Sequence, residues 1–139
     1  LHTAYRRQRQ MCIRDSVYTD AEGVRRAAFF DFDDAGPGFL AYDLCVWLWS
    51  NLPRKAPLEP DEALLKRWQQ YLAGYRAGGG HVTDADLAAL PLFVQLRHLW
   101  NMGEGVARIH HWGANMMSAD WIKKQPDVMA AWARLDLPA

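Results

Sequence analysis

The sequence predicts a mainly helical domain that begins with a small β-hairpin. Two short runs of strand-forming residues, separated by a glycine turn, lie near the beginning of the chain. From about residue 40 onward, apolar residues recur at helical spacing instead of alternating. Half of the 139 residues are hydrophobic, so the chain can bury a core of its own.

Residues 1–16 differ from the rest of the sequence, and we expect a non-native scar or a disordered segment there. They show neither helical nor strand periodicity, and Tyr5–Ser16 resembles a translated sequencing adapter. A basic disordered arm and a tail that binds nucleic acid are the alternatives, because this stretch contains four arginines. We therefore place the native domain at residues 17–139.

The hairpin and the first two helices follow from local patterns. Val17–Thr19 and residues 24–31 are predicted strands, and Gly23 provides the turn between them. Residues 41–50 are apolar on nearly all sides, which is typical of a helix buried in a core. Residues 61–77 are predicted to form an amphipathic helix. Its apolar stripe comprises Leu64, Leu65, Trp68, Leu72 and Tyr75.

The remaining helices are predicted from caps and prolines. Thr83 and Asp86 have the spacing of a capping box and begin a short helix. Pro91 suits the first turn of a new, longer helix that extends to about Ile109. Residues 121–135 are expected to add one or two turns, broken by Pro126. The expected core face of the longer helix consists of Leu92, Phe93, Leu96, Leu99, Trp100, Gly103, Val106 and Ala107.

Composition excludes several classes of partner and location. The chain has 16 basic and 16 acidic side chains, so no bulk charge favours nucleic acid or a membrane surface. No apolar run is long enough to span a bilayer. Two cysteines lack metal-ligand spacing, and Cys45 is expected to be a small buried apolar residue. These features favour a cytoplasmic protein.

The segment from Phe29 to Leu44 contains the candidate functional residues. Its strand ends in Asp31, Asp33 and Asp34, then turns through Gly36 and Gly38 into a helix. Carboxylates at the end of a rigid strand can hold a hard cation such as Mg²⁺, which prefers oxygen ligands. The alternative is that the three acids only solvate a strand end and a turn.

The same segment resembles the metal-binding segment of the aminoglycoside phosphotransferase and choline kinase-like family. The matching positions, at the spacing of that family, are Asp31, Gly36, Gly38, Tyr42, Asp43 and Leu44. The resemblance covers roughly residues 17–135. It implies the helical, carboxy-terminal lobe of a protein-kinase-like fold, present here in truncated form. It also implies an enzyme that transfers the γ-phosphate of ATP to a hydroxyl group of a small molecule.

The resemblance implies roles for individual acids. Asp31 matches the aspartate that holds Mg²⁺ on the phosphates of ATP, and Asp43 matches a buried aspartate that braces the catalytic loop. Asp33, with less support, is a second metal ligand, and Asp33 and Asp34 could instead face the acceptor. The catalytic base and a metal-binding Asn of the family should stand at positions 11 and 16, where this chain has Met11 and Ser16. The chain alone is therefore expected to be inactive.

Two other functions remain open at this point. A non-catalytic kinase-like binding module is expected if Met11 and Ser16 are native residues. A haloacid-dehalogenase-like phosphatase also begins with an Asp-x-Asp run such as Asp31 and Asp33, but it needs later parallel strands where this chain is predicted to be helical.

The long helix contains further candidate site residues, and the sequence does not decide between two roles for them. Residues on one of its faces either wall an acceptor cleft or form a solvated face with a Glu104–Arg108 pair. These residues are Arg97, Asn101, Glu104 and Arg108. Adjacent His110 and His111 point in different directions on a helix and make a poor chelate. Most tryptophans are expected in the core, namely Trp47, Trp49, Trp68 and Trp100, and packing is also the better prediction for Trp112 and Trp121.

Overall fold

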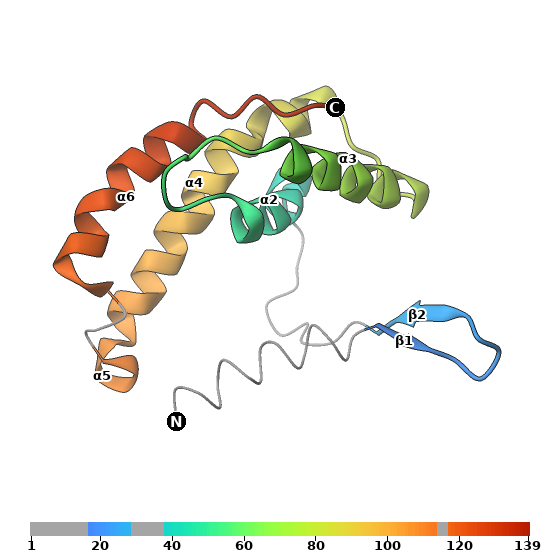
Figure 1. Cartoon of the computed structure of the whole chain (residues 1–139), viewed down its shortest axis with the longest axis horizontal. Helices are drawn as coiled ribbons and strands as arrows, with labels where there is room; N and C mark the ends of the chain where they lie inside the picture. Colours follow the sequence, from blue (N-terminus) through green and yellow to red (C-terminus); the bar gives the residue numbers. More distant parts are fainter. Residues whose placement is uncertain (1–16, 29–37, 114–116) are drawn as a thin grey trace. The chain divides into compact units, whose positions relative to one another are not determined.

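The structure, a computed structural model, describes residues 17–28, 38–113 and 117–139. The chain divides into two units between Pro37 and Gly38. The first unit contains a two-stranded hairpin, and the second contains the helices α2 to α6 (Figure 1). The predicted fold class, mainly helical with a small hairpin, is confirmed. The boundary at residue 16 lies outside the described residues and stays a prediction.

The hairpin pairs β1 (Val17–Thr19) with β2 (Arg25–Ala27) in antiparallel register. Gly23 has a φ of 79°, so the predicted glycine turn is present. The second strand is shorter than the predicted 24–31. It begins at Arg25 because the backbone N–H of Val24 is bound by a side chain in the turn, and residues 29–31 lie outside the described ranges.

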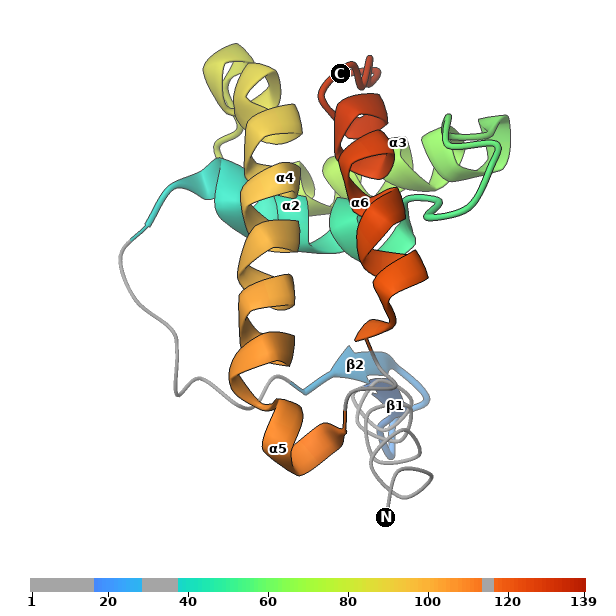
Figure 2. The same cartoon turned by 90° about the vertical axis from the view of Figure 1, so that its left-hand side faces the viewer.

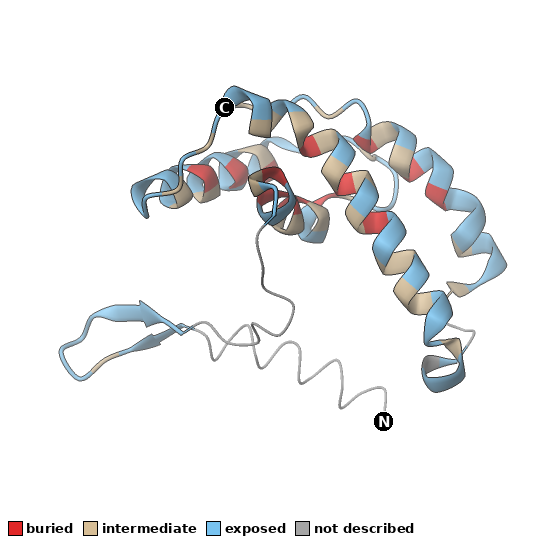
Figure 3. Cartoon of the chain, turned by 180° about the vertical axis from the view of Figure 1, so that it is seen from behind, coloured by how far each residue is buried: buried red, intermediate tan, exposed pale blue. Residues whose placement is uncertain are grey.

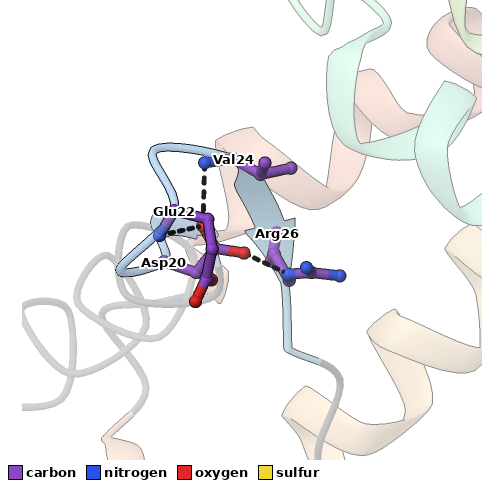
Figure 4. A network of polar contacts seen from close by, with 4 residues as sticks. All are labelled: Asp20, Glu22, Val24 and Arg26. Atoms are coloured by element: carbon purple, nitrogen blue, oxygen red, sulfur yellow. Dashed lines mark hydrogen bonds and ion pairs between the residues drawn. The ribbon is translucent and has the colours of Figure 1, made fainter.

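Asp20 is the residue that organises this turn (Figure 4). Its Oδ1 accepts hydrogen bonds from the backbone N–H groups of Glu22, at 3.1 Å, and Val24, at 2.8 Å. Its Oδ2 accepts a hydrogen bond from Arg26 Nε. The bond from Arg26 is the largest cause that lowers the pKa of the Asp20 carboxyl. The turn is therefore fixed by a local side chain, as is common where Asp begins a turn.

Helix α2 (Leu40–Asn51) lies at the centre of the second unit and packs against α4 (Asp84–Ala107). It exceeds the predicted 41–50 by one residue at each end. Ala41, Leu44, Cys45 and Leu48 are its buried residues. The apolar composition of this segment thus produces a central helix, as predicted.

Helix α3 (Glu62–Ala77) follows the predicted pattern closely. Asp61 caps it, because the Asp61 carboxylate accepts a hydrogen bond from Leu64 N at 2.7 Å. Leu64, Trp68 and Leu72 are buried on its inner face, whereas Leu65 and Tyr75 are only partly buried, so most of the predicted stripe is confirmed. The Trp68 indole also donates to the Pro138 carbonyl at 2.9 Å, so the end of the chain lies against this helix.

Helix α4 is one helix of 24 residues, whereas a short helix and a separate longer helix were predicted. The Thr83–Asp86 capping box is present at its beginning and confirms that part of the prediction. Pro91 lies inside the helix and not in a first turn. Buried Leu90 and Val94 flank Pro91. An interior proline costs about 3 kcal/mol, and burying two such aliphatic side chains contributes about 1.5–3 kcal/mol each, which offsets that cost.

The predicted core face of the long helix is wrong. The buried residues of α4 are Leu90, Val94 and His98, spaced four residues apart. Most residues of the predicted face are exposed instead. They are Leu92 at 57%, Leu96 at 45%, Leu99 at 49%, Trp100 at 48% and Val106 at 57%. Both sets have helical periodicity, and only the packing on α2 shows which one is buried.

Helix α5 (Ile109–Trp112) is a single turn, and α6 (Ala119–Trp132) then packs beside α4 (Figure 2). Ser118 caps α6 by accepting from Trp121 N at 3.2 Å. Pro126 lies within α6 and does not break it, contrary to the prediction. Buried Gln125, Val128 and Trp132 hold the helix on both sides of this proline.

The buried positions of the second unit lie on α2, α3, α4 and α6, apart from Leu52, which follows α2 directly (Figure 3). The core residues are Ala41, Leu44, Cys45, Leu48, Leu52, Leu64, Trp68, Leu72, Leu90, Val94, Val128 and Trp132. Among the described residues, no helix has both the length and the apolar character needed to cross a membrane.

Candidate functional site

The acids predicted to hold a metal lie outside the described residues. These are Asp31, Asp33 and Asp34, and positions 11 and 16 are outside as well. Within residues 17–28, 38–113 and 117–139, no cluster of three or more His, Cys, Asp or Glu side chains could hold a metal ion. Asp43 is therefore the predicted site residue whose surroundings can be given.

Asp43 lies in the first turn of α2, where the amino-terminal end of a helix favours a negative charge. Its position at a helix start is the one that the resemblance implies. The side chain is exposed, however, whereas the aspartate of the family is buried. Within the second unit, Asp43 Oδ2 accepts a hydrogen bond from the hydroxyl of Tyr75 at 3.0 Å.

Tyr75 reaches Asp43 from the last turn of α3. A side chain at Gly80 would prevent this placement, because an added Cβ would lie 2.1 Å from Tyr75 Cδ1. Burial, together with the hydrogen bond to Asp43 and the charge of that carboxylate, raises the pKa of Tyr75. The sequence indicated Tyr75 only as part of a packing stripe, and nothing in it identified the contact with Asp43.

Tyr71 lies one turn before Tyr75 and extends the same aromatic cluster. Its ring stacks on Trp47 with the centroids 5.0 Å apart and the planes at 13°. Burial is the first cause that raises the pKa of Tyr71 to about 12, and the charge of Asp43 adds to it. Both tyrosines therefore stay protonated at neutral pH, and Tyr75 keeps the proton that it donates to Asp43.

Tyr42, the neighbour of Asp43 in the motif, contacts α4. Its hydroxyl accepts a hydrogen bond from Arg97 Nη1 at 3.2 Å, and its ring packs edge-on against Phe93 at 6.1 Å between centroids. The two motif residues thus have different partners. Asp43 is tied to α3 through Tyr75, and Tyr42 is tied to α4 through Arg97.

Cys45 is buried, as predicted, and donates to the Tyr42 carbonyl with an Sγ–O distance of 3.0 Å. Burial raises the pKa of the Cys45 thiol to about 11, against an opposing effect of the Arg97 charge. At neutral pH the group is a thiol and not a thiolate nucleophile. Cys45 therefore contributes packing, as expected for a small buried side chain.

A chain of hydrogen bonds through buried His98 is a feature that sequence reasoning missed. The Trp49 indole donates to His98 Nδ1 at 3.1 Å. His98 Nε2 lies 2.8 Å from Gln125 Oε1, and Gln125 Nε2 donates to the Trp121 carbonyl at 2.6 Å. Because Nδ1 accepts, Nε2 carries the proton and donates to Gln125. The four-residue spacing of His98 from Val94 and Leu90 was the available signal.

The other candidates on the long helix separate into two groups. Arg108 Nε lies 2.8 Å from Glu104 Oε2, which confirms the predicted i,i+4 pair on a solvated face. Arg97, unlike this pair on the solvated face, is half-buried among aromatic rings. His110 and His111 are exposed in α5 and belong to no metal-binding cluster of the described residues.

The tryptophans confirm most of the packing predictions. Trp68 is fully buried, and Trp47 and Trp49 are partly buried against the core. Trp121 packs near His98, with the ring centroids 6.1 Å apart. The prediction that Trp100 lies in the core is wrong, because 48% of its surface is exposed. The side chain of Trp112 lies outside the described part of the structure.

A comparison with protein families shows which family part of this chain is similar to. Residues 13–81 match the model of the phosphotransferase enzyme family (APH), which covers the hairpin, α2 and α3. The resemblance found in the sequence is thereby confirmed over residues 13–81. The match begins within residues 1–16, so the expected domain boundary stays a prediction.

An individual relative is similar over more of the chain. A protein of Deinococcus radiodurans, described as an uncharacterized protein, is 40% identical over 103 residues. This similarity covers 74% of the present chain and 29% of that protein, so the chain spans less than a third of the relative's length. No solved structure matches the chain.

Proposed function

We propose that this chain is part of an ATP-dependent enzyme that transfers the γ-phosphate to a hydroxyl group of a small molecule. The match of residues 13–81 to the phosphotransferase family carries this proposal. The register of Asp31 with Tyr42 and Asp43 supports it. The reaction would take place in the cytoplasm, with ATP and a hydroxyl-bearing metabolite as its small-molecule partners.

In this proposal, the acids of the segment from Phe29 to Leu44 together hold the phosphates of ATP. The carboxylates of Asp31 and Asp33 are oxygen ligands of the kind that Mg²⁺ prefers, so the donor set suits this ion. When bound, Mg²⁺ neutralises charge on the phosphates. Asp43 braces the catalytic loop, and Tyr75 orients the Asp43 carboxylate through its hydroxyl.

The transfer itself needs groups that this chain does not match. The bond from the γ-phosphorus to the bridging oxygen breaks, and a new bond forms to the acceptor oxygen, whose proton must leave. In the resembled family an Asp in a His-Gly-Asp-x-x-x-x-Asn loop assists this step. Met11 stands at its expected position and Ser16 at that of the Asn, so we propose that the chain as given is inactive.

A non-catalytic binding module is the second candidate, favoured by the observation that Met11 and Ser16 occupy these two positions. A haloacid-dehalogenase-like phosphatase has less support. From residue 38 onward, the described parts of the chain contain helices and no strands, whereas that class needs parallel strands after its first Asp.

Determination of the gene sequence upstream of Val17 separates the two candidates. The kinase proposal predicts a His-Gly-Asp-x-x-x-x-Asn loop, with its Asp at position 11 and its Asn at position 16. The product of that gene should then transfer phosphate from ATP in the presence of Mg²⁺. If Met11 and Ser16 prove to be native, the binding-module proposal replaces it.

A further inference from the structure

Arg97 is a half-buried cation on α4 that forms no ion pair in the described part of the chain. The three ion pairs among the described residues join other side chains. Buried charged groups are usually paired with an opposite charge, because removal from water is costly. The absence of an acidic partner for Arg97 among the described residues therefore needs a physical explanation.

Aromatic side chains hold the guanidinium of Arg97 in place. Its Cζ lies 4.4 Å from the ring centroid of Trp100 and 5.5 Å from that of Trp49. Nη1 donates to the Tyr42 hydroxyl at 3.2 Å. A guanidinium fixed by stacking and by one hydrogen bond presents its remaining N–H groups as a planar, oriented fork.

The hydrogen-bonding capacity of Arg97 is largely unused. A guanidinium has five N–H donors, and the bond to Tyr42 uses one of them. The buried Nε has no hydrogen-bond partner among the described residues. Arg97 is therefore half-buried and contacts two aromatic rings, while most of its N–H donors have no acceptor among the described residues.

The electrostatic surroundings also favour a negative ligand. The guanidinium of Arg54 lies over the same indole, 4.6 Å from the Trp49 centroid, and also has no ion pair within the described ranges. His98, which bonds to Trp49, is neutral in its observed hydrogen-bond pattern. The Asp43 carboxylate, next to Tyr42 in sequence, accepts a hydrogen bond from Tyr75 and forms no ion pair with Arg97.

We propose that Arg97 anchors a binding site for an oxyanion, either a carboxylate or a phosphate group of a small molecule. An arginine fork binds such groups through two parallel hydrogen bonds, which gives both strength and orientation. The terminal nitrogens Nη1 and Nη2 are the donors in this site, because Nε is buried.

The position of Arg97 assigns this anion to the acceptor, and this step rests on the proposed phosphotransfer. Tyr42, which fixes Arg97, belongs to the motif helix and precedes Asp43 directly. Exposed Trp100 and Tyr42 offer apolar surface for the organic part of a ligand. The acceptor is therefore an anionic alcohol, such as a hydroxy acid or a sugar phosphate, and not a polyamine.

Binding of the oxyanion can be measured on this chain without any catalysis. NMR signals of the arginine Nε–H groups would be followed during titration with acetate or inorganic phosphate, at constant pH and ionic strength, with chloride as the reference anion. Arg97→Lys would assign the signal. Exposed Arg67 on α3 is the matched control, because it forms no ion pair with any residue that the structure describes.

The expected result is a saturable shift of the Arg97 signal with both oxyanions and no such shift at Arg67. Arg97→Lys should weaken binding at least tenfold, as measured by calorimetry, because a lysine cannot form the two parallel bonds. An Arg97 signal that does not move, or moves only as much as Arg67, would overturn the site and leave Arg97 a packing residue.

A second arm distinguishes the acceptor from the nucleotide as the source of the anion. In the product of the gene with its upstream sequence restored, Arg97→Lys should raise the KM of the acceptor about tenfold and leave the KM of ATP unchanged. A rise confined to ATP would assign the anion to the nucleotide and overturn the acceptor step. If that product transfers no phosphate while the chain still binds oxyanions, the proposed function fails and the site stands.

Discussion

Asp43 and Tyr75 show how a single hydrogen bond ties the candidate site to the helical body. The Tyr75 hydroxyl donates to one oxygen of Asp43, and Gly80 leaves room for the Tyr75 ring. The second oxygen of the carboxylate has no hydrogen bond among the described residues and can accept one from another segment. In the proposed function, Tyr75 would therefore be a positioning residue that acts through Asp43.

This contact predicts the titration of Tyr75. Asp43→Asn removes the negative charge, so the raised pKa of Tyr75 should fall toward the ordinary value for tyrosine. The measurement is NMR of the tyrosine ring carbons as a function of pH. Asp84→Asn, at an exposed position in the first turn of α4, is the control and should leave Tyr75 unchanged. An unchanged Tyr75 pKa in Asp43→Asn would show that the hydrogen bond to Asp43 does not raise this pKa.

His98 predicts how stability depends on pH. Burial lowers the pKa of His98, and the charge of Arg54 lowers it further, against the hydrogen bond to Gln125 that raises it. The folded state therefore favours the neutral ring, and the unfolded state binds a proton at higher pH. The contribution of His98 to the free energy of unfolding is fully present above the ordinary histidine pKa of about 6.5 and is lost as the pH falls below it.

Urea denaturation between pH 7.5 and pH 5 would measure this effect. The wild-type chain should lose stability over this interval, and His98→Gln should show a shallower dependence, because its side chain cannot be protonated. His81→Gln, at an exposed position, is the matched control and should keep the wild-type slope. Equal slopes for wild type and His98→Gln would show that His98 does not titrate as proposed.

At the scale of elements, the patterns that depend on neighbours in sequence could be predicted. Asp61 caps α3, the Thr83–Asp86 box begins α4, and Gly23 turns the hairpin. Each of these depends on groups only a few residues apart. The stripe of α3 was also recognisable, because α3 has one apolar face.

The orientation of α4 could not be predicted, because this helix has two apolar faces. Leu92, Leu96 and Leu99 have the same periodicity as Leu90 and Val94. Contact with α2 buries the second set and leaves the first exposed. The proline was misleading for a related reason, since tertiary burial around Pro91 outweighs the local cost of a proline in a helix.

Two leucines that are two residues apart test this orientation. Leu90→Ala should lower the free energy of unfolding by about 2–5 kcal/mol, because it leaves a cavity in the core. Leu92→Ala, the same substitution at an exposed position of the same helix, should change it by less than about 0.5 kcal/mol. Urea denaturation provides both values. Similar losses for the two variants would show that the predicted face, with Leu92, also packs in the core.

At the scale of the whole molecule, the motif predicted the family that residues 13–81 match, and the helices provide hydrogen-bond partners for Tyr42 and Asp43. Asp43 and Tyr42 could be named from their spacing, whereas Tyr75 and Arg97 lie 32 and 55 residues away from them in sequence. Such contacts depend on how α3 and α4 pack around α2, and no local pattern encodes them. The metal-binding role of Asp31 stays a prediction, because Asp31 lies outside the described residues.

Phosphate transfer by an Asp31→Ala variant is the most direct test of the account. In the product of the gene with its upstream sequence restored, the rate of Mg²⁺-dependent transfer from ATP should fall by about 10²–10³-fold or more, as when one strong electrostatic contact to the transition state is lost. Glu22→Ala, in the hairpin turn, is the matched acidic control and should keep the wild-type rate. Undiminished transfer by Asp31→Ala would contradict the account.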